Sequence, residues 1–494
     1  MNARATNSSA QPLAALQGPD RPGRLLWLLG GLSLAALLLP ASAEAHGIVG
    51  RADLPIPVWL FSWAAAIVLV VSFVALSSLW MTPQLQQQHP RKLIRLSPGV
   101  ESLASLAGVG LFALVVYSGF AGAQVGTVNF SVTFIYVIFW VGLPVASVLF
   151  GDVFRALNPW RTCARVLAAG IRAIRRDRTT TPILCYPTWL GMWPAAAGIV
   201  GFAWLELVYP IGLRDQPSTL AALSLGYFLV MLAGMLIFGV KDWGDQADGF
   251  GVYFNLLSKL SPIGRGEDGV LYLRRPLSGI TGLTLRPGTV TFICTLIGTT
   301  TFDGFSNGGI WRNNEPSLQS AFSDLGFNLT PAMELSYSIG LVFCILLIVA
   351  VYRVGIIGVR SVSQRYDSDT LTRTFAHTLV PIAFAYVLAH YFSLLLWQGQ
   401  AVVPLFSDPL GTGANIFGTA NYQIDYNIIS YAGIWYVQVA ALLAGHVSGL
   451  MLAHDRALVL FEDPEEAVRS QYWMLAVMVA FTSFGLWLLS SVGT

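Results

Sequence analysis

Four of the six histidines in this chain lie in or at the ends of two neighbouring apolar stretches. His377 and His390 belong to the first stretch, and His446 and His454 belong to the second. An imidazole inside a membrane is costly, so it usually has a function there. A helix rises about 1.5 Å per residue, so the 13-residue spacing of His377 and His390 separates them by roughly 20 Å. These two histidines cannot bind one ion together.

Three carboxylates and one histidine are predicted at the outer ends of several apolar segments. Asp303 follows the sixth segment, Glu334 opens the seventh, Glu206 lies near the end of the fourth, and His390 lies in the outer half of the eighth. Such residues from different helices have the ligand types of a divalent metal site. We predict that a divalent metal ion binds His390, Asp303 and His46. The alternative is that Asp303 caps a turn while Glu206 and Glu334 face interfacial water.

A second, inner site is predicted from His377, His446 and His454, which lie toward the opposite side of the membrane. His446 and His454 are eight residues apart, which places them near one face of a helix. A row of this kind could carry protons or ions. The alternative is that these histidines form hydrogen bonds between helices, as Gln438 and Ser448 could also do.

The composition defines the class of protein that must position these side chains. Hydrophobic residues make up 55% of the chain, charged residues only 11%, and the mean hydropathy is +0.63. A water-soluble domain carries about twice that share of charge. The chain is therefore expected to be a polytopic membrane protein in a lipid bilayer. The net charge of +2 and the lack of any nucleic-acid motif argue against a nucleic-acid partner.

Residues 1 to 45 have the pattern of an export signal peptide. A polar start with Arg21 and Arg24 precedes an apolar core of about 16 residues, and an A-x-A cleavage pattern ends at Ala45. Cleavage there would make His46 the first residue of the mature chain, with an α-amine and an imidazole that can chelate a metal together. The alternative is that cleavage occurs elsewhere, or that His46 is an ordinary exposed terminus.

Ten apolar windows of transmembrane length follow the signal. The sixth is short and rich in threonine, and it begins with Arg286 and Pro287, so it could be a broken or re-entrant segment. We predict an all-α transmembrane helical bundle of about ten spans, formed by a single domain over residues 46 to 494. The windows lie at about residues 57–80, 103–122, 131–150, 190–210, 219–240, 284–302, 334–357, 375–397, 431–453 and 471–490.

The basic residues test this topology. If the mature chain starts outside and the loops alternate, 22 Lys and Arg residues fall in the inside loops and only Arg51, Arg214 and Arg312 fall outside. This asymmetry is the positive-inside pattern of multi-pass proteins in a cytoplasmic membrane. It predicts an extracytoplasmic mature N-terminus.

Two kinds of connecting segment also carry a prediction. The inside segments GDVFRALNPW and GVYFNLLSKLSPIG resemble short amphipathic helices on the membrane surface. The outer loop of residues 398 to 430 has no Lys or Arg and reads as an ordered lid, in which Asp408 and Asp425 are further candidates for the outer site. Asp408 with the following proline and glycines equally fits a plain turn.

Several segments together resemble a known family. They are AHGIVGRADLPIPVWLF, FDGFSNGGIW, AHYFSLLLWQGQ, SDPLGTGANIFGTANY and WYVQVAALLAGHVSGLMLAHDRAL. In this pattern, from His46 almost to the C-terminus, the chain is similar to the fenitrothion hydrolases, which are integral proteins of the bacterial inner membrane. The resemblance implies hydrolysis of an organophosphorus triester, such as fenitrothion, to a phenol and a dialkyl thiophosphate. It also implies assembly with related membrane subunits in a hetero-oligomer.

A bound metal ion could perform this hydrolysis. A phenolate leaves readily, so the reaction needs mainly a hydroxide and a Lewis acid, and bound divalent ions can supply both. On this hypothesis His46, His390 and Asp303 bind the ion, and Asp303 and Glu334 are the catalytic carboxylates, with Glu334 as ligand or as base for the attacking water. An apolar small-molecule substrate would reach the site from the bilayer. One rival function is a carrier for copper or another divalent metal, with the inner His377, His446 and His454 as its exit route. The other is a non-catalytic partner subunit.

Overall fold

The computed structural model describes residues 58–86, 90–175, 182–210, 212–266, 269–362, 364–461 and 463–491. Within these ranges, eight helices are long and apolar enough to cross a membrane. This confirms the predicted class, an all-α polytopic membrane protein. The predicted signal peptide and the candidate ligand His46 lie outside the described residues.

The eight candidate spans are single helices or runs of helices joined end to end. Each is bounded by residues close to the predicted windows. They are α2 (Val58–Leu79), α3 (Pro98–Ala121), the run of α4 (Phe130–Thr133), η3 (Phe134–Gly142) and α5 (Leu143–Phe150), α9 (Pro217–Phe238), α14 (Leu329–Val362), the run from α15 (Ser368–Phe375) through η4 (Ala376–Leu379), α16 (Val380–Trp397) and η5 (Gln398–Ala401) to α17 (Val402–Ser407), α18 (Tyr431–Leu460) and α19 (Pro464–Ser491).

The other two predicted windows are also helical, but they do not qualify as spans by length and hydropathy. One is the short apolar helix α8 (Trp193–Leu207) and the other is α12 (Thr289–Ser306). Helix α12 runs without a break and is almost entirely buried, packed between α8, α14 and α16. Because protein rather than lipid surrounds it, α12 tolerates its threonines. The hydroxyls of Thr299 and Thr300 donate hydrogen bonds to the carbonyl of Leu296 in the preceding turn.

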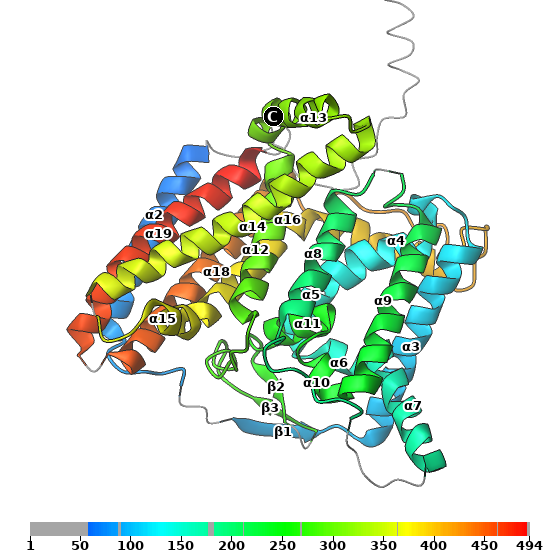
Figure 1. Ribbon diagram of the computed structural model, residues 1–494, viewed down its shortest axis with the longest axis horizontal. Helices are drawn as coiled ribbons and strands as arrows, with labels where there is room; N and C mark the ends of the chain where they lie inside the picture. The colour runs from blue at the N-terminus through cyan, green and yellow to red at the C-terminus, as the bar shows by residue number, and fades with distance from the viewer. Residues whose placement is uncertain are drawn as a thin grey trace, which may run out of the picture. The chain divides into compact units, whose positions relative to one another are not determined.

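The described helices form two packed groups, seen on opposite sides of Figure 1. Helices α2, α14, α16, α18 and α19 pack on one another, with α12 against α14 and α16. Helices α3 and α9 form a second group with α7 (Pro159–Arg175) and α10 (Val240–Gly244). Helix α8 lies between the groups, where it packs on α12 and on α11 (Gly249–Ser258).

Two features differ from the sequence-based expectation. Strands β1 (Arg91–Arg95), β2 (Ile263–Arg265) and β3 (Val270–Leu273) form a small antiparallel sheet in the order β1-β3-β2, although no strand was predicted. The segment predicted as a second surface helix forms α11, which is buried along most of its length against α5 and α8. Its apolar face and its aromatic rings pack inside the protein, so the surface prediction for this segment was wrong.

The remaining short elements connect the spans. They are η2 (Gly126–Val128), α6 (Val153–Leu157) and α13 (Gly309–Asp324). In the predicted lid, both oxygens of Asp408 accept backbone N–H groups of Thr412 and Gly413, and Asp425 accepts the N–H of Asn427. These two aspartates therefore stabilise turns, as the plain reading of the loop predicted.

Candidate functional site

The candidate site is centred on Asp303, which lies in the last turn and a half of α12. Its carboxyl is 2% exposed, and the helix that carries it packs against α16. His390 and Tyr391 lie in the middle of α16, and both side chains are buried. The packing of α12 against α16 therefore brings together residues that are 87 and 88 positions apart in the sequence.

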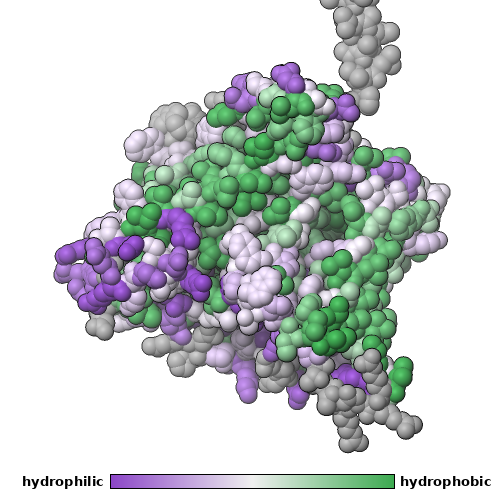
Figure 2. Space-filling model, viewed as in Figure 1, coloured by the Kyte–Doolittle hydropathy of each residue, from purple (hydrophilic) through white to green (hydrophobic). Residues whose placement is uncertain are grey.

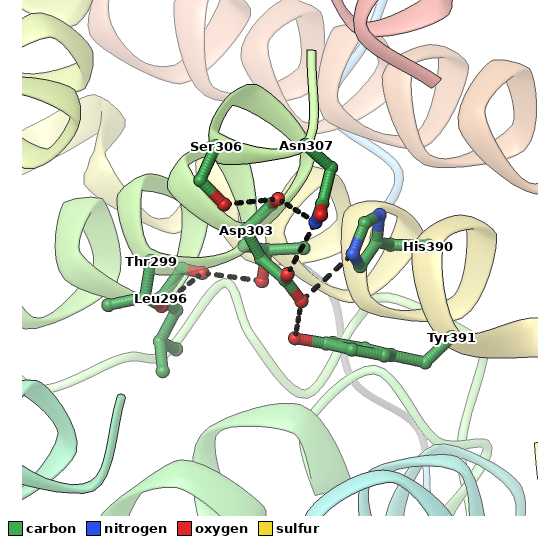
Figure 3. Close-up of polar contacts among 8 residues, drawn as sticks. Leu296, Thr299, Asp303, Ser306, Asn307, His390 and Tyr391 are labelled. Carbon is green, nitrogen blue, oxygen red and sulfur yellow. Dashed lines mark hydrogen bonds and ion pairs between the residues drawn. The ribbon is translucent and has the colours of Figure 1, made fainter. Parts of the chain in front are cut away.

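Asp303 binds both side chains through one carboxylate oxygen (Figure 3). His390 Nε2 lies 2.9 Å from Asp303 Oδ2, and the Tyr391 hydroxyl donates a 2.6 Å hydrogen bond to the same atom. Asn307 and Ser306 donate hydrogen bonds to the Asp303 carbonyl, at 2.8 and 3.0 Å, and hold the end of α12 in shape. The predicted pairing of His390 with Asp303 is present, and Asp303 does more than cap a turn.

The hydrogen bond to Asp303 assigns the tautomer of His390. An ionised carboxylate only accepts hydrogen bonds, so with Asp303 ionised the imidazole proton is on Nε2. Nδ1 then carries the lone pair, and this nitrogen is the one able to accept a proton or bind a metal. The carboxylate also stabilises positive charge on the ring if Nδ1 is protonated.

Glu206 adds a second buried carboxyl to this part of the protein. It lies on α8, is 5% exposed, and is close enough to Asp303 for the two groups to interact electrostatically. The alternative that Glu206 faces interfacial water is therefore wrong, because the neighbouring helices cover it. Tyr253 of α11 lies beside Glu206, and Trp140 of η3 lies beside Tyr391. The ring centroids of Trp140 and Tyr253 are 5.4 Å apart.

Helix η3 has π-helical hydrogen bonding over nine residues, Phe134–Gly142. Stretches of π-helix are rare, and they occur often at functional sites because they shift the register of side chains. In this chain the π-helix carries Trp140, which stands beside Tyr391. The apolar sequence FIYVIFWVG gave no signal for this geometry.

Two further buried polar residues at about the depth of His390 were missed as site residues by sequence reasoning. Ser393 follows His390 by one helical turn, and Gln438 lies on α18; both are buried, and the Ser393 hydroxyl and both amide atoms of Gln438 have no hydrogen-bond partner. Helices α16 and α18 run in opposite directions, with Trp397 against Tyr431 and Pro381 against Gly445. This register places Gln438 at about the level of His390 along the two helices, so the bundle holds unpaired polar atoms at this depth.

The predicted metal set is only partly assembled. Among the described residues, no three His, Cys, Asp or Glu side chains come together as a site for one metal ion. Glu334 lies at the start of α14, half-buried, and it does not complete such a set with His390 and Asp303. His46, the remaining predicted ligand, falls outside the described part of the chain.

The inner histidines do not form a common site. His377 Nδ1 donates to the carbonyl of Thr374 at 3.0 Å, and His446 Nδ1 donates to the carbonyl of Leu442 at 2.7 Å, so each is bonded to its own helical turn. In both rings Nε2 is buried without a partner. Among the described residues, these two histidines and His454 do not come together as a three-ligand metal site, and each is bonded to a different part of the backbone.

His454 and the adjacent Asp455 have a structural role, which for His454 agrees with the alternative of hydrogen bonds between segments. His454 Nε2 bonds to the carbonyl of Trp80 at 2.9 Å, and Gln471 lies 3.2 Å from its other nitrogen. Asp455 accepts hydrogen bonds from the Trp80 indole, from the backbone of residues 84 and 85 and from Gln86. The pair therefore fixes the segment that follows α2.

The site is thus a buried carboxylate, imidazole and phenol from two helices, and unpaired polar atoms of Ser393 and Gln438 lie at a similar depth in the bundle. Its geometry can orient a general base, and it offers hydrogen-bond donors to a bound ligand. Comparison of the chain with family models, with curated proteins and with solved structures gives no match.

Proposed function

We propose that this membrane protein hydrolyses apolar organophosphorus triesters, of which fenitrothion is an example, and releases a phenol at the Asp303–His390 site. The observation that carries the proposal is the 2.9 Å bond between His390 Nε2 and Asp303, which leaves Nδ1 as the basic nitrogen. An imidazole oriented by a carboxylate is the common general base of hydrolases. The proposal includes a location in the bacterial inner membrane, with the mature N-terminus outside.

In the proposed reaction, His390 Nδ1 removes a proton from a water molecule as the water oxygen attacks phosphorus. The new bond is between this oxygen and phosphorus, and the bond that breaks joins phosphorus to the aryl oxygen. Asp303 is the positioning residue, because it holds the ring and stabilises the imidazolium. The proton then passes from His390 to the phenolate or to water, which restores the base.

Ser393 and Gln438 support a polar ligand at this site. A buried polar group without a hydrogen bond costs about 1–3 kcal/mol, so a ligand that supplies the partner gains from it. The hydroxyl and the amide N–H groups are donors, and they suit the oxygen or sulfur atom on phosphorus, which gains negative charge as the nucleophile adds. Neither group carries a charge, as befits a neutral triester.

The pair of His390 and Asp303 also fits a metal-binding histidine, because such a histidine usually donates its second N–H to a carboxylate. A divalent ion would be held by His390 through Nδ1, with His46 as the proposed further ligand. When bound, it would polarise the phosphoryl group and lower the pKa of a bound water. His390 would then serve as ligand, and Asp303 would orient it in the same way.

The test is hydrolysis of fenitrothion by detergent-solubilised protein. The reaction is monitored through the release of nitrophenolate. We expect His390→Gln to lower kcat/KM by about 10²–10⁴, the usual contribution of a general base. His446→Gln is the matched control, because His446 is equally buried on the neighbouring helix but is bonded only to its own turn. Equal turnover of wild type and His390→Gln, at equal folded protein, would reject the proposal.

A second candidate function is transport of a divalent metal ion or protons. The observation that favours it is that the Nε2 atoms of His377 in η4 and of His446 in α18 are both buried without a hydrogen-bond partner. Turnover in detergent distinguishes the two functions, because a carrier needs two compartments. Ion flux in proteoliposomes that His446→Gln abolishes, without hydrolysis in detergent, would favour the carrier.

A further inference from the structure

A large apolar cavity lies between α3, η3, α8 and α9, and we call it the lateral chamber. Its volume is about 670 Å³, which lies within the range of roughly 300–1,000 Å³ that is common for ligand sites. Phe202 and Phe250 line it and also pack against Trp140, so the chamber lies on the far side of Trp140 from Tyr391. None of the residues that line it is charged.

The aromatic walls of the chamber turn their polar atoms away from it. The Trp160 indole donates a 2.6 Å hydrogen bond to Asp248, and the Tyr227 hydroxyl donates a 2.9 Å bond to the same carboxylate. The Trp204 indole donates to Ser338 at 2.8 Å. Asp248 and Ser338 do not line the chamber, so these three rings present mainly carbon to its interior. An occupant therefore finds apolar contact and few hydrogen-bond partners.

The chamber is continuous with the apolar outer surface of α9. Helices α8 and α9 follow each other in the chain, but α9 packs on α3, α7 and α10, whereas α8 packs on α11 and α12. Leu223 of α9 lines the chamber and is 47% exposed, and Leu229 on the same helix is exposed as well. Figure 2 shows hydrophobic surface bordering a hollow at α8 and α9. The entrance thus lies among membrane-spanning helices, where the surrounding medium is lipid.

We propose that the lateral chamber binds one hydrocarbon chain of a membrane lipid, which enters between α8 and α9. The lining makes no demand for hydrogen bonds, and burial of a hydrocarbon chain against aromatic and aliphatic side chains gains dispersion contacts that an empty cavity forfeits. The lipid headgroup stays at the membrane surface. This binding site is independent of the hydrolase proposed above.

Gly201 offers a direct way to fill the chamber. It lines the cavity on α8, and a Cβ added there meets no atom within 4 Å, so Gly201→Phe places a ring in the chamber without a backbone clash. The matched control is Gly226→Phe on α9. A Cβ at Gly226 also meets open space, but Gly226 does not line the chamber.

The test uses nanodiscs of phosphatidylcholine that carries a photoreactive diazirine in one acyl chain. We expect cross-links to concentrate on the chamber residues of the wild type and of Gly226→Phe, and to fall by about tenfold there in Gly201→Phe, because overfilling a packed site is unfavourable. Melting curves of all three proteins establish that they are folded, and Gly201→Leu replaces the phenylalanine variant if it is not.

Two outcomes would overturn the proposal. One is chamber labelling that Gly201→Phe and Gly201→Leu leave unchanged. The other is that a small aryl diazirine added to the nanodiscs labels the chamber while the acyl-chain probe does not. This result would assign the chamber to a free aromatic molecule. Loss of fenitrothion hydrolysis has no bearing on either result.

Discussion

Asp303 and Asp248 are both buried carboxylates, and their surroundings differ in one respect that matters for chemistry. Asp248 accepts hydrogen bonds from Asn158, Trp160, Tyr227 and the backbone of Gly251. These amide, indole and phenol donors do not ionise near neutral pH. Asp303 is bonded to an imidazole, whose second ring nitrogen can accept a proton or a metal ion. The type of donor, rather than the number of hydrogen bonds, distinguishes a reactive carboxylate from a structural one.

The two carboxylates also connect different parts of the fold. Asp248 precedes α11 as its N-cap and ties that helix to α9 and to the start of α7. Asp303 joins α12 to α16 through two side chains. We therefore expect substitutions at Asp248 to act mainly on stability and substitutions at Asp303 to act mainly on turnover.

The largest effect is expected for Asp303→Asn. The amide can donate a hydrogen bond to His390, which would favour the wrong tautomer, so kcat/KM for the triester should fall by about 10²–10⁴. Tyr391→Phe removes only the other donor to the same oxygen, and we expect about a fivefold loss, equivalent to one ordinary hydrogen bond. Turnover is measured in detergent, with the melting temperature of each variant recorded alongside.

A loss of turnover that is the same for Asp303→Asn and Tyr391→Phe would break the comparison. It would mean that Asp303 supports the packing of α12 and α16 without selecting the tautomer of His390. A pH–rate profile separates the two cases, because only loss of the base removes the limb that reports its protonation.

The next effect is on stability, at Asp248→Ala. This change leaves the buried donors of Asn158, Trp160 and Tyr227 without an acceptor and removes the cap of α11. At about 1 kcal/mol or more for each orphaned donor, the free energy of unfolding should fall by about 3 kcal/mol or more. Thermal melting in detergent measures it.

Asp369→Ala is the matched control for Asp248→Ala. Asp369 forms an exposed ion pair with Arg353, and such pairs contribute little to stability. Melting temperatures that fall equally for both variants would show that the buried hydrogen bonds of Asp248 contribute no more than a surface pair.

The smallest effect concerns pH. Burial raises the pKa of Asp248 above its ordinary value, although its four hydrogen bonds oppose the shift. The folded protein then keeps this proton at a pH where the unfolded chain has lost it, so stability should fall as the pH rises from about 4 through the folded pKa. Asp248→Asn should remove this part of the pH dependence. A melting series over pH that keeps the same slope in the variant would contradict the assignment.

The sequence predicted the candidate site only in part, and the misses have physical causes. His390 and Asp303 were expected together because both are costly residues at similar depth. For Glu206 the sequence left open whether it joins this group or faces interfacial water, because its burial depends on neighbours from three other helices. Ser393 and Gln438 gave no signal as site residues, because a polar residue in an apolar helix more often forms a bond between helices.

By itself the sequence determined that the chain is a polytopic helical protein and where its long apolar helices lie, because lipid requires each backbone polar group to be satisfied within its own helix, and composition reveals such segments. Only the tertiary structure decided which side chains meet. Helices α16 and α18 approach so closely that a Cβ on Gly445 would overlap Ala385, and contacts of this kind fix the register of one helix against another. The meeting of Asp303 with His390 depends on such packing between distant segments, which no local pattern encodes.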